Sequence, residues 1–367
     1  MWMFLATEIL FFGGVFLAYT VYRLYYPKDF ADISGRLNVA VALWTLWHFR
    51  AELPAYKGQR ARAVAVLAML SLGFLMSERL TMWSEKRLFG DQIVQAVTTP
   101  YQRLVVTRWK DDTRLYINGN LQFSSRDEHR YHEALVHPVM AALPRAKEVL
   151  ILGGGDGMAL REVLKYEGVK AVTLVDLDPQ MTQLFRDSGE LSQLNAHSFH
   201  DPRVSIVNMD AAQWLETAEA SFDAVIVDFP DPSNYGLGKL YSVPFYRMLA
   251  RHVRAGGLVS VQSTSPYYAP HAFWSIEATL KESGWHVRPY HAYVPSFGEW
   301  GFMLASREPG YAPPESIPVA TRFLTPASMR QLFEFPPDMS RMAVEANYLN
   351  TQPLVRYFEQ DWSDALR

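Results

Sequence analysis

Short apolar runs rich in β-branched residues alternate with helical patterns from residue 146 onward. The runs are "EVLIL", "AVTLVD", "VSIVN", "FDAVIVD" and "GLVSVQS", separated by glycines and short polar residues. This rhythm is typical of parallel strands joined by crossover helices. Two further runs, "GWHVRPYHAYV" and "EWGFMLAS", predict a closing antiparallel pair. The chain should therefore contain a seven-stranded, doubly wound α/β sheet that binds its ligand beyond the carboxyl ends of the strands.

The chain of 367 residues divides into four predicted segments. Residues 1–90 predict a membrane-associated helical segment. Residues 91–140 predict a small β-hairpin domain plus a helix, with its turn at Asn118 and Gly119. Residues 141–310 predict a Rossmann-like catalytic domain, and residues 311–367 a C-terminal tail that packs on it.

The first apolar stretch, residues 1–22, is about long enough to span a bilayer. It lacks the basic start and the cleavage site of a secretory signal. Arg23, Lys28 and Arg36 follow it, which by the positive-inside rule places them in the cytoplasm. A second run, residues 63–76, is short for a span. We expect a membrane-attached protein with membrane lipid as a partner and a cytoplasmic catalytic domain; buried core helices are the alternative.

Charge and composition exclude several classes of site. The net charge is −3, and no basic excess indicates a nucleic-acid partner. The chain has no cysteine, so disulfides and thiolate metal sites are excluded. The stretch "HEALVH", from His132 to His137, is one residue too long for the H-E-x-x-H zinc pattern. We expect no metal and no prosthetic group.

The stretch "VLILGGGDGMALREV" predicts a strand, a glycine-rich turn and a helix. Glycines such as Gly153 and Gly155 let a ligand approach the backbone, yet the spacing does not fit the dinucleotide pattern G-x-G-x-x-G. A pyrophosphate-binding turn would keep the helix start free of negative charge, but Asp156 lies in this one. A cationic nucleoside such as a sulfonium compound fits better. The alternative is that Asp156 caps the following helix.

Carboxylates follow the other predicted strands as well. Asp176 lies 20 residues after Asp156, where an acid accepts hydrogen bonds from ribose hydroxyls. Asp210 follows the third strand, and Asp228 and Asp231 follow the fourth in "DFPDP". A single such residue is usually a cap or turn residue. Acids at successive strand ends instead predict a shared site.

Asp228 and Asp231 form the second informative pattern. Pro230 and Pro232 stiffen their loop and hold the two carboxylates in a defined relation. Such a pair suits a polyamine, whose ammonium groups are separated. One carboxylate can bind the distal ammonium while the other takes the proton from the attacking nitrogen.

Several motifs, in order, resemble the spermidine synthase (polyamine aminopropyltransferase) family. They cover about residues 91–306 and include "PYQRLVV", "LYINGNLQFSSRDEHRYHEALVHP", "LILGGGDGMALREVLKY", "VTLVDLDP", "FDAVIVDFPDP", "LYSVPFY" and "VPSFGEWGF". The resemblance implies a Rossmann-like, methyltransferase-type sheet. It also implies transfer of a 3-aminopropyl group from decarboxylated S-adenosylmethionine, the co-substrate, to putrescine or a related amine, giving spermidine and 5′-methylthioadenosine.

The resemblance also implies roles for individual residues. Asp228 becomes the catalytic proton acceptor. The amine site comprises Tyr131, His132, Asp156, Asp231 and Phe297. The nucleoside site comprises Gln102, Gly153, Gly155, Asp176, Asp210, Ala211 and Tyr235.

The chain departs from the family pattern at four of these positions. Asp176 replaces the usual Glu, and Ala211 the usual Gly. Tyr235 stands where a proline usually contacts the nucleoside, and Phe297 where a Tyr usually meets the amine. The last two bear on the choice of acceptor.

Two other interpretations remain open. The chain could be a methyltransferase that uses intact S-adenosylmethionine, or a catalytically silent polyamine-binding membrane protein. "RLTMWSEKRLFGDQIV" resembles the lead-in of membrane-attached family members, and residues 1–40 resemble a helix of cytochrome c oxidase subunit III. The expected partners are amine and nucleoside sulfonium substrates, with a homodimer or larger assembly.

Overall fold

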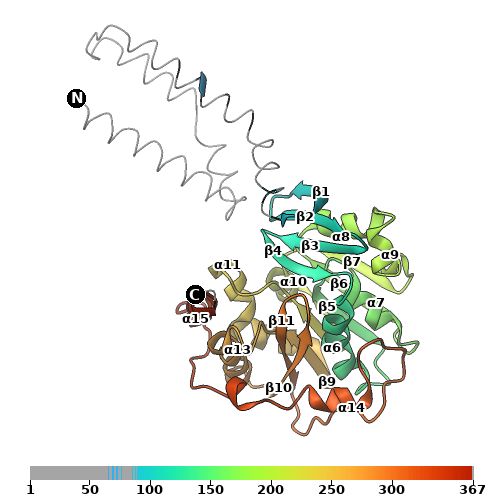
Figure 1. Cartoon of the computed structure of the whole chain (residues 1–367). Helices are drawn as coiled ribbons and strands as arrows, with labels where there is room; N and C mark the ends of the chain where they lie inside the picture. Colours follow the sequence, from blue (N-terminus) through green and yellow to red (C-terminus); the bar gives the residue numbers. More distant parts are fainter. Residues whose placement is uncertain are drawn as a thin grey trace, which may run out of the picture. The chain divides into compact units, whose positions relative to one another are not determined.

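A computed structural model describes residues 89–365 continuously, together with Ala65, Ala68, Met69, Leu72, Met76, Glu85 and Arg87. The chain separates into two compact units, Met1–Gln122 and Phe123–Arg367. Figure 1 shows the elements of both units.

The first unit contains an antiparallel sheet with the strand order β1-β2-β3-β4. Its strands are β1 (Gln92–Thr98), β2 (Arg103–Trp109), β3 (Asp112–Ile117) and β4 (Asn120–Ser124), the last of which runs across the unit boundary. Asn118 and Gly119 connect β3 to β4 with φ angles of 52° and 88°. Two successive positive φ angles are the requirement of a type I′ hairpin turn. The small antiparallel sheet predicted from the sequence is thus confirmed.

The second unit is built on a seven-stranded sheet of order β10-β11-β9-β8-β5-β6-β7. Its central strands β9, β8, β5, β6 and β7 are parallel, whereas β11 and β10 are antiparallel and close one edge. The strands are β5 (Glu148–Gly153), β6 (Ala171–Asp176), β7 (Val204–Asn208), β8 (Phe222–Asp228), β9 (Val253–Gln262), β10 (His286–Val294) and β11 (Gly298–Ser306). This sheet confirms the predicted Rossmann-like fold.

The order of the strands locates the binding edge of this sheet. From β5 the chain runs outward through β6 and β7, and then returns to place β8 on the other side of β5. Such a reversal opens a crevice at the carboxyl ends of the two strands that flank it. Gly153, the last residue of β5, pairs with Asp228, the last residue of β8.

Helices cover both faces of the sheet, which explains why the central strands are apolar throughout. Leu150, Leu152, Val225 and Val227 are fully buried in a cluster that also contains residues of α12 and α13. On the sheet, α6 contacts β8, β9, β10 and β11, and it also contacts α7. The helices are α6 (Glu128–Met140), α7 (Met158–Leu164), α8 (Pro179–Asp187), α9 (Leu191–Leu194), α10 (Ala211–Thr217), α11 (Tyr235–Gly238), α12 (Val243–Leu249), α13 (Pro270–Glu282), α14 (Pro326–Gln331) and α15 (Pro353–Ala365).

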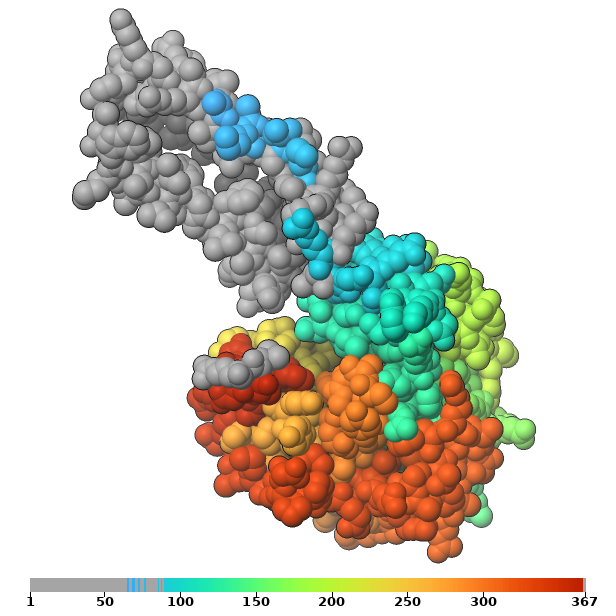
Figure 2. Space-filling view, viewed as in Figure 1, coloured from blue at the N-terminus to red at the C-terminus, as the bar shows by residue number. Residues whose placement is uncertain are grey.

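The C-terminal segment wraps over the second unit, as the orange and red surface in Figure 2 shows. Its last helix, α15, lies beside α13. Asp361 of α15 accepts hydrogen bonds from His271 Nδ1 at 2.7 Å and from the Ala272 backbone N–H at 3.2 Å. A carboxylate there satisfies the free N–H groups of the first turn of α13. The tail therefore stabilises the helix on which it packs.

The buried Glu133 of α6 fastens a second part of this segment. Its carboxylate accepts hydrogen bonds from the backbone N–H groups of Arg322, Phe323 and Leu324 at 2.6, 2.9 and 2.9 Å. Three charge-assisted hydrogen bonds to one buried carboxylate are stronger than three neutral ones. Glu133 thus fixes residues 322–324 against α6.

The predicted membrane attachment is wrong and is corrected here. Among the residues that the structure describes, no helix combines the length and the apolarity needed to cross a bilayer. The stretch 1–22 lies outside the described residues, and so do most of residues 63–76. The membrane-lipid partner and the localisation inferred from these two runs are withdrawn with it.

Candidate active site

The glycine-rich turn after β5 brings two carboxylates close to the backbone. A side chain at Gly153, where φ is 81°, would overlap the carbonyl oxygen of Asp228. At Gly155, a Cβ atom would lie 2.6 Å from Oδ2 of Asp176. Both glycines are therefore required by close approach, and the turn lies directly between the ends of β6 and β8.

Asp228, at the end of β8, is paired with Tyr131 of α6. The Tyr131 hydroxyl donates a hydrogen bond of 2.5 Å to Oδ1 of Asp228. Burial and the charge of Asp156 raise the pKa of Asp228, the His132 cation and the Tyr131 hydrogen bond oppose the rise, and the resulting pKa is about 6. Burial and the Asp228 charge also raise the pKa of Tyr131, which therefore stays protonated. The pair supplies a carboxylate that is more basic than one in water.

His132, the next residue of α6, is held by a buried ion network. Its Nδ1 donates to Oε2 of Glu128 at 2.7 Å, and Arg161 of α7 binds both oxygens of that carboxylate at 3.0 and 2.9 Å. Burial disfavours the imidazolium, but the hydrogen bond and charge of Glu128 outweigh it and raise the pKa of His132 to about 9. The site thus holds a cation beside the carboxylates of Asp156 and Asp228.

Glu128 and Arg161 were not among the residues predicted from the sequence. Burial opposes the charge of Glu128, yet His132 and Arg161 lower its pKa to about 2. The spacing of Glu128 and His132, four residues apart on one helix, is a signal that could have indicated this pair. Nothing local to either residue indicates Arg161, which lies 33 residues from Glu128.

Asp156 lies in the turn before α7. Its Oδ1 accepts a 2.9 Å hydrogen bond from the backbone N–H of Met158, the first residue of the helix, whose N-cap residue is Gly157. It is also almost fully buried, and its charge raises the pKa values of both His132 and Asp228. Within the described residues, its Oδ2 atom has no hydrogen-bond donor. That oxygen can accept a hydrogen bond from a bound cation.

Asp176 ends β6 and faces the glycine turn. Its Oδ1 accepts a 2.8 Å hydrogen bond from the backbone N–H of Asp178. Burial and the charges of Asp178 and Asp156 raise the pKa of Asp176, hydrogen bonds from the backbone N–H groups of Asp178 and Gly155 oppose the rise, and the resulting pKa is about 7. A carboxyl group with this pKa readily accepts hydrogen bonds from hydroxyl groups.

Asp231 lies in the loop after β8 and is positioned from β9. Gln262 donates a 2.9 Å hydrogen bond to Oδ1 of Asp231, and its own Oε1 accepts from the backbone N–H of Thr264 at 2.8 Å. Burial outweighs the hydrogen bond from Gln262, and the pKa of Asp231 is raised to about 7. The Tyr241 hydroxyl contacts the carbonyl oxygens of residues 229 and 230 at 3.2 and 3.1 Å, which fixes the loop. Sequence reasoning missed Gln262 and Tyr241.

An aromatic wall adjoins Tyr131. The ring centroid of Phe297 lies 6.1 Å from that of Tyr131 and 4.9 Å from that of Trp300. Phe302 packs on the other side of Tyr131, at 5.4 Å. Edge-on aromatic contacts of this kind hold rings in place and offer apolar faces to methylene groups.

Three further residues were predicted to contact the nucleoside: Asp210, Ala211 and Tyr235. Asp210 is the cap of α10, accepting from the Ala212 N–H at 2.9 Å, and it forms a 2.6 Å ion pair with Lys239. Ala211 is buried as the first residue of α10. Tyr235 begins α11 and is 69% exposed. Asp210 therefore already has two partners in the second unit.

Gln102 belongs to the first unit, where its backbone N–H donates to Thr99 Oγ1 at 3.0 Å.

His137, considered above for metal binding, has other partners. Its ring nitrogens contact the Tyr166 hydroxyl at 2.9 Å and the Glu162 carboxylate at 3.0 Å.

Known proteins similar to this chain indicate its family. A family profile described as "Spermine/spermidine synthase domain" matches residues 128–312. Polyamine aminopropyltransferase 2 of Ralstonia nicotianae is 61% identical over 342 residues, which cover 91% of this chain and 67% of the relative. Polyamine aminopropyltransferase of Leptospira interrogans is 47% identical over 334 residues, covering 91% and 67%.

Solved structures show the same fold. The crystal structure of spermidine synthase from Thermotoga maritima superposes with a TM-score of 0.61 at 25% identity, covering 67% of this chain and 85% of that one. A spermidine synthase in complex with the transition-state analogue AdoDATO gives a TM-score of 0.63 at 26% identity, covering 67% and 86%.

The fold and the carboxylate cluster define a Rossmann-like transferase that acts on a nucleoside and an amine. The chain belongs to the spermine/spermidine synthase family, and the predicted class of enzyme, a polyamine aminopropyltransferase, is confirmed. The predicted co-substrate of this class, decarboxylated S-adenosylmethionine, is confirmed with it. The methyltransferase and silent-protein alternatives are set aside.

The N-terminal residues share in this relationship. The chain spans about two-thirds of the length of the curated relatives, and the match to the Ralstonia protein covers 91% of the chain. Residues 91–367 alone would not supply that coverage, so the match extends into the first ninety residues. The comparisons give no support to the resemblance of residues 1–40 to cytochrome c oxidase, and those residues lie outside the described part of the chain.

Proposed function

We propose that this chain transfers the aminopropyl group to putrescine, with Asp228 as the proton acceptor. The putrescine nitrogen attacks the aminopropyl carbon bonded to the sulfonium. The new C–N bond forms as the C–S bond breaks, and the electron pair of that bond neutralises the sulfur as methylthioadenosine leaves. The amine loses one proton, which Asp228 takes. The observation that supports this role is the 2.5 Å contact between Tyr131 and a buried, basic Asp228.

Asp228 and its neighbours suit this proton transfer. A carboxylate with a pKa of about 6 is ionised at neutral pH and accepts a proton more readily than a carboxylate in water. The Tyr131 hydroxyl orients it. The His132 cation keeps Asp228 ionised despite its burial, and it offsets part of the negative charge of the site.

Asp231 and the aromatic wall are proposed to bind the rest of the amine. The distal ammonium of putrescine forms an ion pair with Asp231, whose position Gln262 fixes. Phe297 and Tyr131 contact the methylene groups between the two nitrogens. Phe297 has no hydroxyl group, so this part of the site recognises the amine by apolar contact alone.

We propose that the other predicted residues bind the nucleoside co-substrate. The free oxygen of Asp156 binds the ammonium of the aminopropyl group. Asp176 accepts hydrogen bonds from the ribose hydroxyls, which Gly153 and Gly155 allow to approach. Further proposed nucleoside contacts come from Gln102, Asp210, Ala211 and Tyr235, and for Asp210 the Lys239 ion pair has to rearrange or be shared.

Turnover of the purified protein tests the proposal. Decarboxylated S-adenosylmethionine and putrescine should yield equal amounts of spermidine and methylthioadenosine by mass spectrometry. Asp228→Asn should lower kcat by at least about a hundredfold, the lower end for loss of a general base, with methylthioadenosine affinity nearly unchanged. Asp187→Asn, at a surface carboxylate paired with Arg186, is the control. Wild-type turnover by Asp228→Asn would disprove the assignment.

The homodimer or larger assembly expected from the sequence stays a prediction. Light scattering coupled to size-exclusion chromatography of the full chain measures it directly, because the molar mass of one chain is 41.9 kDa.

A further inference from the structure

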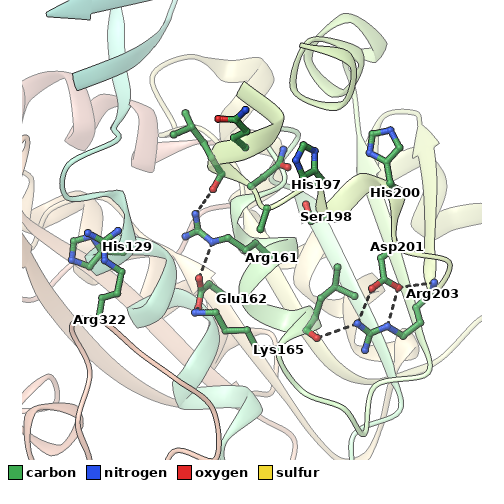
Figure 3. A pocket seen from close by; sticks show the side chains of 15 residues that line it. His129, Arg161, Glu162, Lys165, His197, Ser198, His200, Asp201, Arg203 and Arg322 are labelled. Carbon is green, nitrogen blue, oxygen red and sulfur yellow. Dashed lines mark hydrogen bonds and ion pairs between the residues drawn. The ribbon is translucent and has the colours of Figure 1, made fainter. Parts of the chain in front are cut away.

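A second cavity lies in the Phe123–Arg367 unit, apart from the carboxylate cluster. Its volume is about 650 Å³, within the range of sites for small metabolites. Residues of α7, of the segment 193–203 and of the C-terminal segment line it, as Figure 3 shows. Asp156, Asp176, Asp228 and Asp231 are not part of its lining. No role in the proposed aminopropyl transfer accounts for this cavity.

The charge of the lining is positive. Four of the lining residues are Arg or Lys and two are Glu or Asp, and Glu128, which binds Arg161 from outside the lining, reduces the excess to one positive charge before any histidine is protonated. Arg161 binds Glu128, Glu162 and the carbonyl oxygen of Leu194. Lys165 pairs with Glu162 at 2.6 Å, and Arg203 pairs with Asp201 at 2.8 Å. These three cations are neutralised within the protein.

The remaining basic groups have no such partners. Within the described part of the chain, the guanidinium of Arg322 and the rings of His197 and His200 form no hydrogen bond or ion pair. The Nδ1 atom of His129 is buried without a hydrogen-bond partner. Burial and the charge of Arg322 lower the pKa of His129. A buried ring nitrogen without a hydrogen-bond partner costs free energy unless a ligand supplies that partner.

These free groups lie at two ends of the cavity. Figure 3 shows His129 and Arg322 together on one side and His197 and His200 on the other, with Arg161 between them. The two histidine rings of the second group are 6.4 Å apart. Leu164, Leu194 and Ala196 add apolar surface to the lining. Such an arrangement suits a ligand with more than one anionic group.

We propose that this cavity binds a phosphorylated small molecule, with Arg322 and His129 contacting one phosphate and His197 and His200 another. Arginine matches the geometry of phosphate oxygens, and charge-assisted hydrogen bonds to phosphate are strong. The three hydrogen bonds from residues 322–324 to Glu133 hold the backbone of Arg322 in place, so its side chain begins from a fixed point. The volume accommodates a diphosphate with an attached sugar or base.

Pyrophosphate titrated into the full-length protein tests the proposal by isothermal titration calorimetry. A saturating concentration of methylthioadenosine keeps the carboxylate cluster occupied. We expect saturable binding of pyrophosphate, and at least tenfold weaker binding of inorganic phosphate, because a single phosphate reaches only one end of the cavity. The result does not depend on turnover, so it stands or fails separately from the aminopropyltransferase assignment.

Two variants and a matched control locate the site. Arg322→Gln and His197→Gln should each weaken pyrophosphate binding by about tenfold or more, the usual effect of losing one charge-assisted hydrogen bond. Neither side chain forms a hydrogen bond or an ion pair among the described residues, so both variants should melt close to the wild-type temperature. Arg145→Gln removes the same charge from an exposed position outside the cavity and should bind normally. Absence of wild-type binding, or equal weakening by Arg145→Gln, would overturn the proposal.

Discussion

The hydroxyl of Tyr131 lies 2.5 Å from Oδ1 of Asp228, and this hydrogen bond joins helix α6 to the end of strand β8. The two residues are 97 positions apart in the chain. Tyr131 supplies the only hydrogen bond that the described residues donate to the Asp228 carboxylate from a side chain. Tyr131 therefore influences the orientation of the Asp228 carboxylate and the pH range in which that carboxylate is ionised.

Removing that hydrogen bond should alter the pH dependence of turnover. The bond stabilises the ionised form of Asp228 and so lowers its pKa, which is about 6 in the intact site. Tyr131→Phe should therefore move the acid limb of kcat to higher pH and reduce the plateau by about tenfold. A pH profile of initial rates measures both effects. Tyr348→Phe, at a surface hydroxyl bonded to Glu282, should leave the profile unchanged.

Glu128 should control the ionisation of His132. The pKa of His132 is raised to about 9 mainly through the hydrogen bond and charge of Glu128, which overcome burial. Glu128→Gln should lower that pKa by more than one unit, measured from the imidazole signals in an NMR titration. His286→Gln, at an exposed ring, helps to assign the spectrum. An unchanged His132 titration would contradict the network described here.

The same pair should make stability depend on pH. Because the pKa of His132 rises from 6.5 to about 9 on folding, its contribution is complete below about pH 6.5 and is lost as the pH rises through 9. The pKa of Glu128 falls from 4.5 to about 2, so its contribution is complete above about pH 4.5 and is lost below it. Urea midpoints of wild type and His132→Gln should therefore converge between pH 6.5 and 10. A constant difference would show that His132 stabilises the fold by packing alone.

Asp231 should govern affinity for the diamine more than the chemical step. Asp231→Asn removes the proposed partner of the distal ammonium but leaves Asp228 in place. We expect KM for putrescine to rise by about tenfold to a hundredfold, with kcat reduced less than fivefold. Methylthioadenosine affinity, measured by calorimetry, should stay at the wild-type value. A large loss of kcat at unchanged KM would assign Asp231 to proton transfer instead.

Gly155 should tolerate no side chain. An added Cβ would lie 2.6 Å from Oδ2 of Asp176 and 2.9 Å from Cγ of Met181. Gly155→Ala should lower the free energy of unfolding by about 1–3 kcal/mol and weaken methylthioadenosine binding, because Asp176 has to move. Gly189→Ala places the same methyl group where no atom lies within 4 Å, and it should change neither quantity. Thermal melts and calorimetry distinguish the two variants.

The sheet could be predicted from the sequence because each strand is a run of consecutive residues with a recognisable apolar pattern. Runs such as residues 149–152 and 224–227 are apolar throughout, as burial on both faces requires, and acids follow them at the binding edge. Asp176 and Asp228 could be located in this way. The partners of these acids could not, because contacts such as Glu128 with Arg161 or Asp231 with Gln262 join distant segments.

Local signals gave only part of the surroundings of Asp210. The sequence locates Asp210 shortly after β7, but not its ion pair with Lys239, a residue whose proximity depends on the path of the chain after β8. The apolar runs before residue 90 satisfied a hydropathy criterion, but apolarity over fourteen residues does not distinguish a bilayer from other apolar surroundings.

Tyr131, His132 and Glu133 are consecutive, and each contacts a different part of the molecule. The first two face Asp228 and Glu128, while Glu133 binds the backbone of residues 322–324. An engineer who wishes to enlarge the amine pocket therefore cannot rotate or shift this turn of α6, since doing so would release the C-terminal segment. Acceptor preference in this scaffold has to be redesigned from the adjoining aromatic wall, at positions such as Phe297 and Trp300.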